Sequence, residues 1–205
     1  MSPLPPLVVM GVSGCGKSTM GSLLGERLGV PFFDGDDFHP PANKAKMAGG
    51  VPLNDDDRAP WLAEIGAALA SPAGGADSCI IACSALKRSY RDLLRSFAPG
   101  VVFIHLSGDA AIISARLSTR KHEYMPGSLL ASQLATLEPL EADEAHVLVD
   151  IHADPASLVS DVVRELEAKD LPSEFSSRAG LRTAAGQGQA CRNLSIASSA
   201  GDCPM

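Results

Sequence analysis

The sequence lacks any run close to the roughly 20 consecutive apolar residues that a membrane-spanning helix requires, so we expect no membrane partner. It also lacks an excess of basic residues, since 24 Asp and Glu outnumber 17 Lys and Arg and give a formal net charge of -7. Nucleic-acid-binding domains usually carry a basic face, so we expect no nucleic-acid partner. An anionic small molecule stays compatible with this charge, because its binding needs only a local cluster of arginines.

The cysteines lack a metal-binding pattern. There are five, an odd number, and no two have the spacing of metal ligands: Cys15, Cys79, Cys83, Cys191 and Cys203. Cys79 and Cys83 fall in one apolar run, which predicts small core residues. Cys15 lies in a glycine-rich stretch, where we favour a tolerated small residue over a redox-sensitive thiol. Residues 1–6 lack the basic segment of a signal peptide, and together these features favour the reducing cytoplasm.

The stretch Gly11–Ser18, which reads Gly-Val-Ser-Gly-Cys-Gly-Lys-Ser, fits the phosphate-binding pattern of a P-loop. The apolar run Leu7–Met10 predicts a strand before it, and the apolar residues after it recur at helical spacing. Glycines allow backbone N–H groups to turn around an anion, and a helix start adds positive potential. We therefore expect Lys17 to reach the outer phosphates of a nucleotide and Ser18 to hold Mg²⁺.

Apolar runs alternate with helical patterns along the chain, at residues 7–10, 30–33, 79–83, 101–106 and 145–151. This alternation predicts an α/β fold of the P-loop kinase type, with a five-stranded parallel sheet flanked by helices and a lid. The loops after the strands should lie along one sheet edge, where ligands bind. We expect this domain to span residues 1–171. Residues 172–205, rich in Ser, Ala, Gly and Gln, are predicted to be a mostly disordered tail.

The acidic residues of the predicted site do not follow the third strand. That strand ends Ile-Ala-Cys-Ser at residues 81–84, without the carboxylate that motor ATPases use there, so the motor ATPase class is disfavoured. The turn Asp34-Gly35-Asp36 after the second strand supplies carboxylates instead, two residues apart on one side of an extended segment. One could hold Mg²⁺ through water, while the other binds a substrate hydroxyl and accepts its proton. A solvated acidic turn is the alternative.

Arginines supply local positive charge in this acidic sequence. Arg88, Arg91 and Arg95 recur at helical spacing, so they share one face of the helix expected over residues 85–97. Together with Arg58 from the loop before, Arg88 and Arg91 predict a site for an anionic substrate such as a carboxylate. A salt-bridged surface helix is the alternative for these side chains.

Further cations flank the loop expected over residues 118–128. In a kinase-like layout this loop is the lid, and Arg116, Arg120 and Lys121 would close over the phosphates and stabilise the transferring group. His39 lies in the loop after the second strand, where it either contacts the substrate or is an ordinary polar loop residue. No spacing of histidines favours a metal, and none is assigned to them.

Several blocks of the sequence resemble the bacterial gluconokinase family. The resemblance covers about residues 6–169, and its blocks lie at Gly11–Thr19, Asp34–Met47, Gly50–Leu62, Ala82–Arg95 and Leu129–Glu138. The His-Pro pair in the second block and the Asp-Asp-Arg-Ala-Pro-Trp-Leu segment in the third are far more specific than the P-loop. The tail after Leu171 resembles nothing in that family.

The resemblance implies ATP-dependent phosphorylation of D-gluconate to 6-phospho-D-gluconate with Mg²⁺, on a fold related to shikimate kinase and usually as a homodimer. This reaction would feed carbohydrate-acid catabolism and the pentose phosphate pathway. The implied ATP-binding residues are Gly11, Val12, Ser13, Gly14, Cys15, Gly16, Lys17, Ser18, Thr19 and Arg116. The implied catalytic residues are Lys17, Asp36 and Arg120, and the substrate-binding residues are Asp36, His39, Arg58, Arg88 and Arg91. The implied Mg²⁺ ligands are Ser18 and Asp34.

Two other functions stay open on the sequence alone. The first is a kinase for another small hydroxy acid, which the His39-Pro40 pair and the Trp61 segment disfavour. The second is a P-loop protein that binds a nucleotide and a partner without transferring phosphate.

Overall fold

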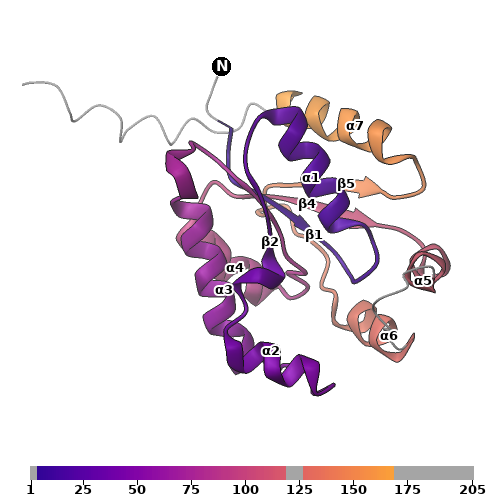
Figure 1. Cartoon of the computed structure of the whole chain (residues 1–205). Coiled ribbons are helices and arrows are strands. Elements are labelled where there is room, and N and C mark those ends of the chain that lie inside the picture. The colour runs from indigo at the N-terminus through magenta and orange to yellow at the C-terminus, as the bar shows by residue number, and fades with distance from the viewer. Residues whose placement is uncertain (1–3, 119–126, 169–205) are drawn as a thin grey trace, which may run out of the picture. The chain divides into compact units, whose positions relative to one another are not determined.

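The computed structural model describes residues 4–118 and 127–168 of the 205-residue chain. The described residues build a five-stranded sheet in the order β2-β3-β1-β4-β5, with every neighbouring pair parallel (Figure 1). Its strands are β1 (Leu7–Met10), β2 (Phe32–Asp34), β3 (Ile80–Ala82), β4 (Val102–Ser107) and β5 (His146–Asp150). The predicted five-stranded parallel α/β sheet is therefore confirmed. The tail predicted for residues 172–205 lies outside the described residues.

Helices cover both faces of the sheet. Figure 1 shows α1 and α7 on one face, and α3 and α4 on the other. The described helices are α1 (Lys17–Leu28), α2 (Pro41–Ala48), α3 (Asp55–Ala70), α4 (Arg88–Phe97), α5 (Ala110–Ser118), α6 (Gly127–Thr136) and α7 (Pro155–Ala168). Short 3₁₀ helices, η1 (Gly35–Phe38) and η2 (Ala73–Gly75), complete the regular structure of these residues.

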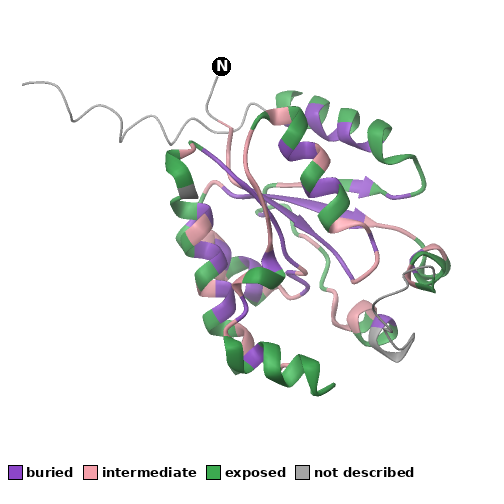
Figure 2. Cartoon of the chain, viewed as in Figure 1, coloured by how far each residue is buried: buried purple, intermediate pink, exposed green. Residues whose placement is uncertain are grey.

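Strand β1 lies at the centre of both core layers. Leu7 and Val9 point to the face of α1 and α7, and Val8 and Met10 to the face of α3 and α4, because side chains alternate along a strand. All four are fully buried, and Figure 2 shows the same burial along the neighbouring strands. Burial on both faces explains why this strand reads as an unbroken apolar run.

Local contacts and backbone conformation decide where α3 and α4 begin. Helix α3 begins at Asp55, because Asn54 caps it: its Oδ1 accepts from the Asp57 N–H at 2.8 Å. The Asn54 N–H in turn donates to Asp57 Oδ2 at 3.1 Å, which completes a capping box. Helix α4, expected from residue 85, begins at Arg88, because Ala85 has a left-handed φ of 44° and the N-cap Lys87 is extended, with a ψ of 148°.

The parallel register places three loops at one edge of the sheet. Val9 of β1 and Asp34 of β2 both pair with Ala82 of β3, so these strands end level with one another. The loops that follow them, including the P-loop and the acidic turn, must therefore meet, as the sequence predicted. Among the helices described, none is both long and apolar enough to cross a membrane.

Candidate active site

The P-loop connects β1 to α1 through glycines that no other residue could replace without strain. Gly16 caps α1 with a φ of 103°, so the free N–H groups of the first helical turn begin directly after the loop. Gly14 has a φ of 82°, and a Cβ there would lie 2.5 Å from Leu117 Cγ. The Lys17 ammonium donates to the Val12 carbonyl at 3.0 Å, which holds its charge beside the loop.

The predicted metal-binding pair lies together beside this loop. Ser18 Oγ, in the first turn of α1, donates to Asp34 Oδ2 at the end of β2 with a distance of 2.7 Å. The other oxygen of Asp34 accepts from the Asp36 N–H at 3.1 Å. Gly35 allows this turn to lie against β3, since a Cβ on it would be 2.1 Å from the Ala82 carbonyl oxygen. A hydroxyl and a carboxylate thus converge from two elements, as the sequence predicted.

Trp61 fixes the far side of the acidic turn. Its indole N–H donates to the Gly35 carbonyl at 2.7 Å, and its ring stacks on the His39 imidazole with centroids 4.2 Å apart. The His39 Nε2 is 4.0 Å from Asp36 Oδ1, just beyond direct hydrogen-bond distance. The Asp36 side chain is 86% exposed, so its carboxylate faces solvent beside the stacked ring.

Asn43 determines which nitrogen of His39 carries the proton. Its Nδ2 donates to the Asp57 carbonyl at 2.7 Å and also lies 3.4 Å from His39 Nδ1. A donor at Nδ1 requires that nitrogen to be the acceptor, so the neutral ring carries its proton on Nε2, toward Asp36. Burial lowers the pKa of His39, and the charges of Arg58 and Lys44 lower it further. The ring is therefore neutral at pH 7.

Arg91 does not take the place predicted for it. Its side chain is fully buried, with Nε 2.6 Å and Nη2 3.0 Å from the Glu144 carboxylate. The same guanidinium donates to four backbone carbonyls, those of Ala85, Leu86, Glu138 and Pro139. The prediction that Arg91 binds a substrate carboxylate is wrong, because its donors already hold the connection between α6 and β5.

Arg88 likewise faces this connection rather than a substrate. Its guanidinium contacts Asp143 at 2.6 Å and 2.9 Å and Asp92 at 3.3 Å. The helical spacing correctly placed Arg88 and Arg91 on a common side of α4, but that side packs against residues 138–144. The salt-bridged alternative therefore holds for Arg88. Arg58 is the remaining arginine of the predicted set, with its Nε 3.4 Å from the Leu53 carbonyl and its guanidinium carbon 6.0 Å from the Tyr90 ring centroid.

A cavity of about 320 Å³ opens beside the P-loop. Gly14, Cys15, Gly16 and Thr19 form one wall, and Arg116 with residues of the segment 151–158 forms another. Arg116 Nη2 donates to the Ile151 carbonyl at 2.8 Å, which joins the end of α5 to the segment after β5. Cys15 is 1% exposed and burial raises its pKa, which agrees with a packing role. Arg120 and Lys121 lie outside the described residues.

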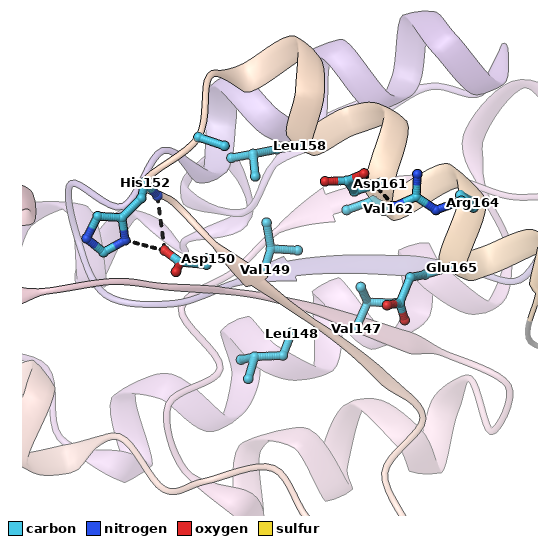
Figure 3. A pocket seen from close by; sticks show the side chains of 11 residues that line it. Val147, Leu148, Val149, Asp150, His152, Leu158, Asp161, Val162, Arg164 and Glu165 are labelled. Atoms are coloured by element: carbon cyan, nitrogen blue, oxygen red, sulfur yellow. Dashed lines mark hydrogen bonds and ion pairs between the residues drawn. The ribbon is translucent and has the colours of Figure 1, made fainter.

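A second hollow, of about 360 Å³, lies between β5 and α7 (Figure 3). Figure 3 shows His152 bonded to Asp150 at one end of it, and Asp161 paired with Arg164 at the other. This hollow contains none of the site residues predicted from the sequence. The cavity at the P-loop is therefore the candidate for the active site.

Sequence reasoning missed Gln133 and Asn43. Gln133 reaches the P-loop from α6, since its Oε1 accepts from the Ser13 N–H at 2.6 Å. Asn43 is 3% exposed and joins α2 to the start of α3. In the sequence, each of the two is only a polar residue within a predicted helix. That pattern does not identify the partner of its side chain.

A P-loop that opens a helix, a carboxylate paired with its serine, and a cavity lined by the loop define a phosphotransferase of the P-loop kinase class. The shikimate kinase family model matches residues 13–167 of the chain, which agrees with this class.

Individual relatives narrow the class. The gluconokinase of Gluconobacter oxydans is 44% identical over 164 residues, which cover 80% of this chain and 92% of that protein. The thermoresistant gluconokinase of Escherichia coli K12 is 46% identical over 142 residues, covering 69% of this chain and 81% of that protein. The crystal structure of a gluconokinase from Sinorhizobium meliloti 1021 matches with a TM-score of 0.74 and 44% identity, covering 82% of this chain and 94% of that chain. The chain belongs to the gluconokinase family.

The buried Arg91–Glu144 pair yields a stability prediction. Arg91→Met should lower the free energy of unfolding by about 3–5 kcal/mol, because the buried Glu144 carboxylate would lose its bidentate partner. Arg95→Met is the matched control, since its partners Asp92 and Asp143 are about half exposed, and its cost should not exceed about 1 kcal/mol. Urea unfolding followed by circular dichroism measures both. If Arg91→Met unfolds at the same urea concentration as the wild type, the buried pair does not stabilise the fold as predicted.

The pKa of His39 predicts how stability changes with pH. Its pKa in the folded protein lies below the ordinary 6.5, so the unfolded state takes up the proton first as the pH falls. The wild type should therefore lose stability between about pH 7 and pH 5, and His39→Gln should lose less over that range. His152→Gln is the opposite control, because donation of a hydrogen bond to the Asp150 carboxylate raises the pKa of His152. Chemical unfolding at each pH measures the three slopes, and identical slopes for wild type and His39→Gln would refute the prediction.

Proposed function

We propose that this protein transfers the terminal phosphoryl group of ATP to D-gluconate and releases 6-phospho-D-gluconate and ADP. The observation that carries the proposal is the contact of Ser18 with Asp34 at 2.7 Å, beside a P-loop lysine, in a chain of the gluconokinase family. A hydroxyl and a carboxylate at this place are what a kinase needs to hold the phosphate-bound metal.

The residues fit Mg²⁺ as the metal of the reaction. Mg²⁺ prefers oxygen ligands and is usually bound through one or two protein groups together with water and substrate phosphates. Ser18 and Asp34 offer that kind of donor set, while the described residues contain no cluster of three or more His, Cys, Asp or Glu that could hold a metal alone. When bound there, the ion would neutralise charge on the phosphates of ATP.

The P-loop would hold the phosphates of ATP. The backbone N–H groups of residues 14–18 lie in the loop and the first turn of α1, where they favour an anion. Lys17 would leave the Val12 carbonyl for a phosphate oxygen, since a charged acceptor makes the stronger hydrogen bond. The cavity beside Thr19 and Arg116 would receive the nucleoside, because it continues directly from the loop.

The acidic turn would receive the sugar acid. Asp36 carries the exposed carboxylate, which would orient the C6 hydroxyl and could accept its proton. His39 presents an Nε2–H on the same side and would bind a further hydroxyl. Arg58 is our remaining choice among the described arginines for the gluconate carboxylate, now that Arg91 and Arg88 are engaged elsewhere. We keep Arg120 as the lid cation that stabilises the transferring phosphoryl group.

We further propose that the enzyme acts in the cytoplasm as a homodimer and supplies 6-phosphogluconate to sugar-acid catabolism. The three cysteines among the described residues are free thiols, which supports a reducing compartment. The homodimer rests on the family resemblance.

The neighbouring carboxylates of the acidic turn test the catalytic assignment. Asp36→Asn should lower kcat by about 100-fold or more, because the acceptor hydroxyl loses its carboxylate partner. Asp37→Asn makes the same chemical change one residue away on an exposed side chain, and should leave kcat within about twofold. Steady-state kinetics with gluconate and MgATP measure both. Near-normal turnover by Asp36→Asn would remove Asp36 from the mechanism.

Lys17 and the acceptor are tested with the same assay. Lys17→Ala should lower kcat by about 100-fold or more through loss of charge at the phosphates, with its thermal midpoint retained. The wild type should use gluconate with a kcat/KM well above that for shikimate and related sugar acids. Better turnover of another acceptor would overturn gluconate as the substrate, and nucleotide-dependent partner binding without phosphorylation would favour a switch protein.

A further inference from the structure

Helix α6 reaches the P-loop through one side chain. Gln133 Oε1 accepts from the Ser13 N–H at 2.6 Å, and Gln133 Nε2 donates to Ser13 Oγ at 3.1 Å, across 120 residues of sequence. A backbone N–H can only donate, so the glutamine atom that meets it must be the oxygen. This fixes the orientation of the amide and leaves its NH₂ group facing the serine hydroxyl.

The contact makes the Ser13 hydroxyl oxygen an acceptor and leaves its hydrogen for another partner. A hydroxyl oxygen that accepts from an amide still has its own hydrogen to donate. Within the described part of the chain, Gln133 is the one side chain bonded to this hydroxyl. The carbonyl of the preceding residue, Val12, holds the Lys17 ammonium at 3.0 Å, so Ser13 adjoins the charge that would face the phosphates.

Gln133 holds this position because α6 is anchored to the core. Leu130, one turn before it, is 6% exposed within the cluster that also includes β1 and α1. Just beyond the helix, the Glu138 N–H donates to the Leu86 carbonyl at 2.8 Å, and Arg91 holds the Glu138 carbonyl at 3.2 Å. The fold thus fixes the helix that presents the amide.

We propose that Gln133 is a positioning residue that turns the Ser13 hydroxyl into a hydrogen-bond donor toward the phosphoryl group being transferred. The inference rests on the proposed kinase function. In the step, the acceptor hydroxyl oxygen forms a bond to the γ-phosphorus, and the bond from that phosphorus to the bridging oxygen of ADP breaks. The acceptor proton passes to Asp36 or to water. Ser13 keeps its proton throughout and stabilises negative charge on a terminal phosphoryl oxygen.

Gln133→Glu separates this role from simple bracing of the loop. The new carboxylate still accepts from the Ser13 N–H, so the brace stays, but it would also accept from the hydroxyl and turn its proton away from the phosphate. Ser13→Ala removes the hydroxyl itself. Each change should lower kcat about 10- to 100-fold, the range for one hydrogen bond to a charged group, with the KM for gluconate nearly unchanged.

The experiment is a double-mutant cycle. Steady-state kinetics with MgATP and gluconate, and the slow hydrolysis of ATP without acceptor, are measured for wild type, both single variants and the double variant. In the Ser13→Ala background, Gln133→Glu should lower kcat less than threefold, because no hydroxyl is left to turn; that residual change isolates the effect of the added charge. Ala131→Glu adds the same charge to an exposed position on α6 and should leave kcat within twofold.

The outcomes are separable. Equal losses for Gln133→Glu in both backgrounds, or wild-type kcat for Ser13→Ala, would overturn the inference. Wild-type protein that hydrolyses ATP but does not phosphorylate gluconate would instead overturn the proposed acceptor, and the cycle would then be read from ATP hydrolysis. Thermal midpoints within a few degrees of the wild type confirm that the variants compared are folded.

Discussion

The hydrogen bond from Ser18 to Asp34 joins the start of α1 to the end of β2, and the proposed chemistry of the site depends on that junction. It exists because β1, β2 and β3 run parallel and end level, with β3 between the other two. Gly35 permits the turn after β2 to lie against Ala82, where a side chain would collide with the carbonyl. The second strand thus brings a carboxylate to the serine of the P-loop, in a sheet whose third strand ends without one.

Two arginines of α4 have a structural role, which the amino-acid composition does not reveal. Arg91 and Arg88 hold the segment 138–144, which connects α6 to β5, through Glu144 and Asp143. By fixing the end of α6, they also fix the helix that carries Gln133 to the P-loop. Arg88 and Arg91, which suggested a substrate site, therefore stabilise the helix that contacts the P-loop.

Short-range sequence patterns predicted the features that depend on neighbouring residues. The alternation of apolar runs with helical patterns was enough to predict the sheet, and the position of the acidic turn after β2 was enough to predict that it meets the P-loop. The choice of Asp34 rather than Asp36 as the partner of Ser18 came from the family resemblance. The start of α4 was missed because the left-handed Ala85 and the extended Lys87 decide it, and helical periodicity does not reveal backbone conformation at single residues. The roles of Arg91 and Gln133 depend on partners 53 and 120 residues away, which periodicity cannot identify.

A crystal structure with gluconate, Mg²⁺ and a non-hydrolysable ATP analogue tests the central claim most directly. The account predicts Mg²⁺ at about 2.0–2.1 Å from Ser18 Oγ, with Asp34 either a ligand or bonded to a ligand water. It also predicts the gluconate C6 hydroxyl within about 3 Å of the Asp36 carboxylate and in line with the γ-phosphate. A metal held away from both Ser18 and Asp34, or a C6 hydroxyl that faces away from Asp36, would contradict it.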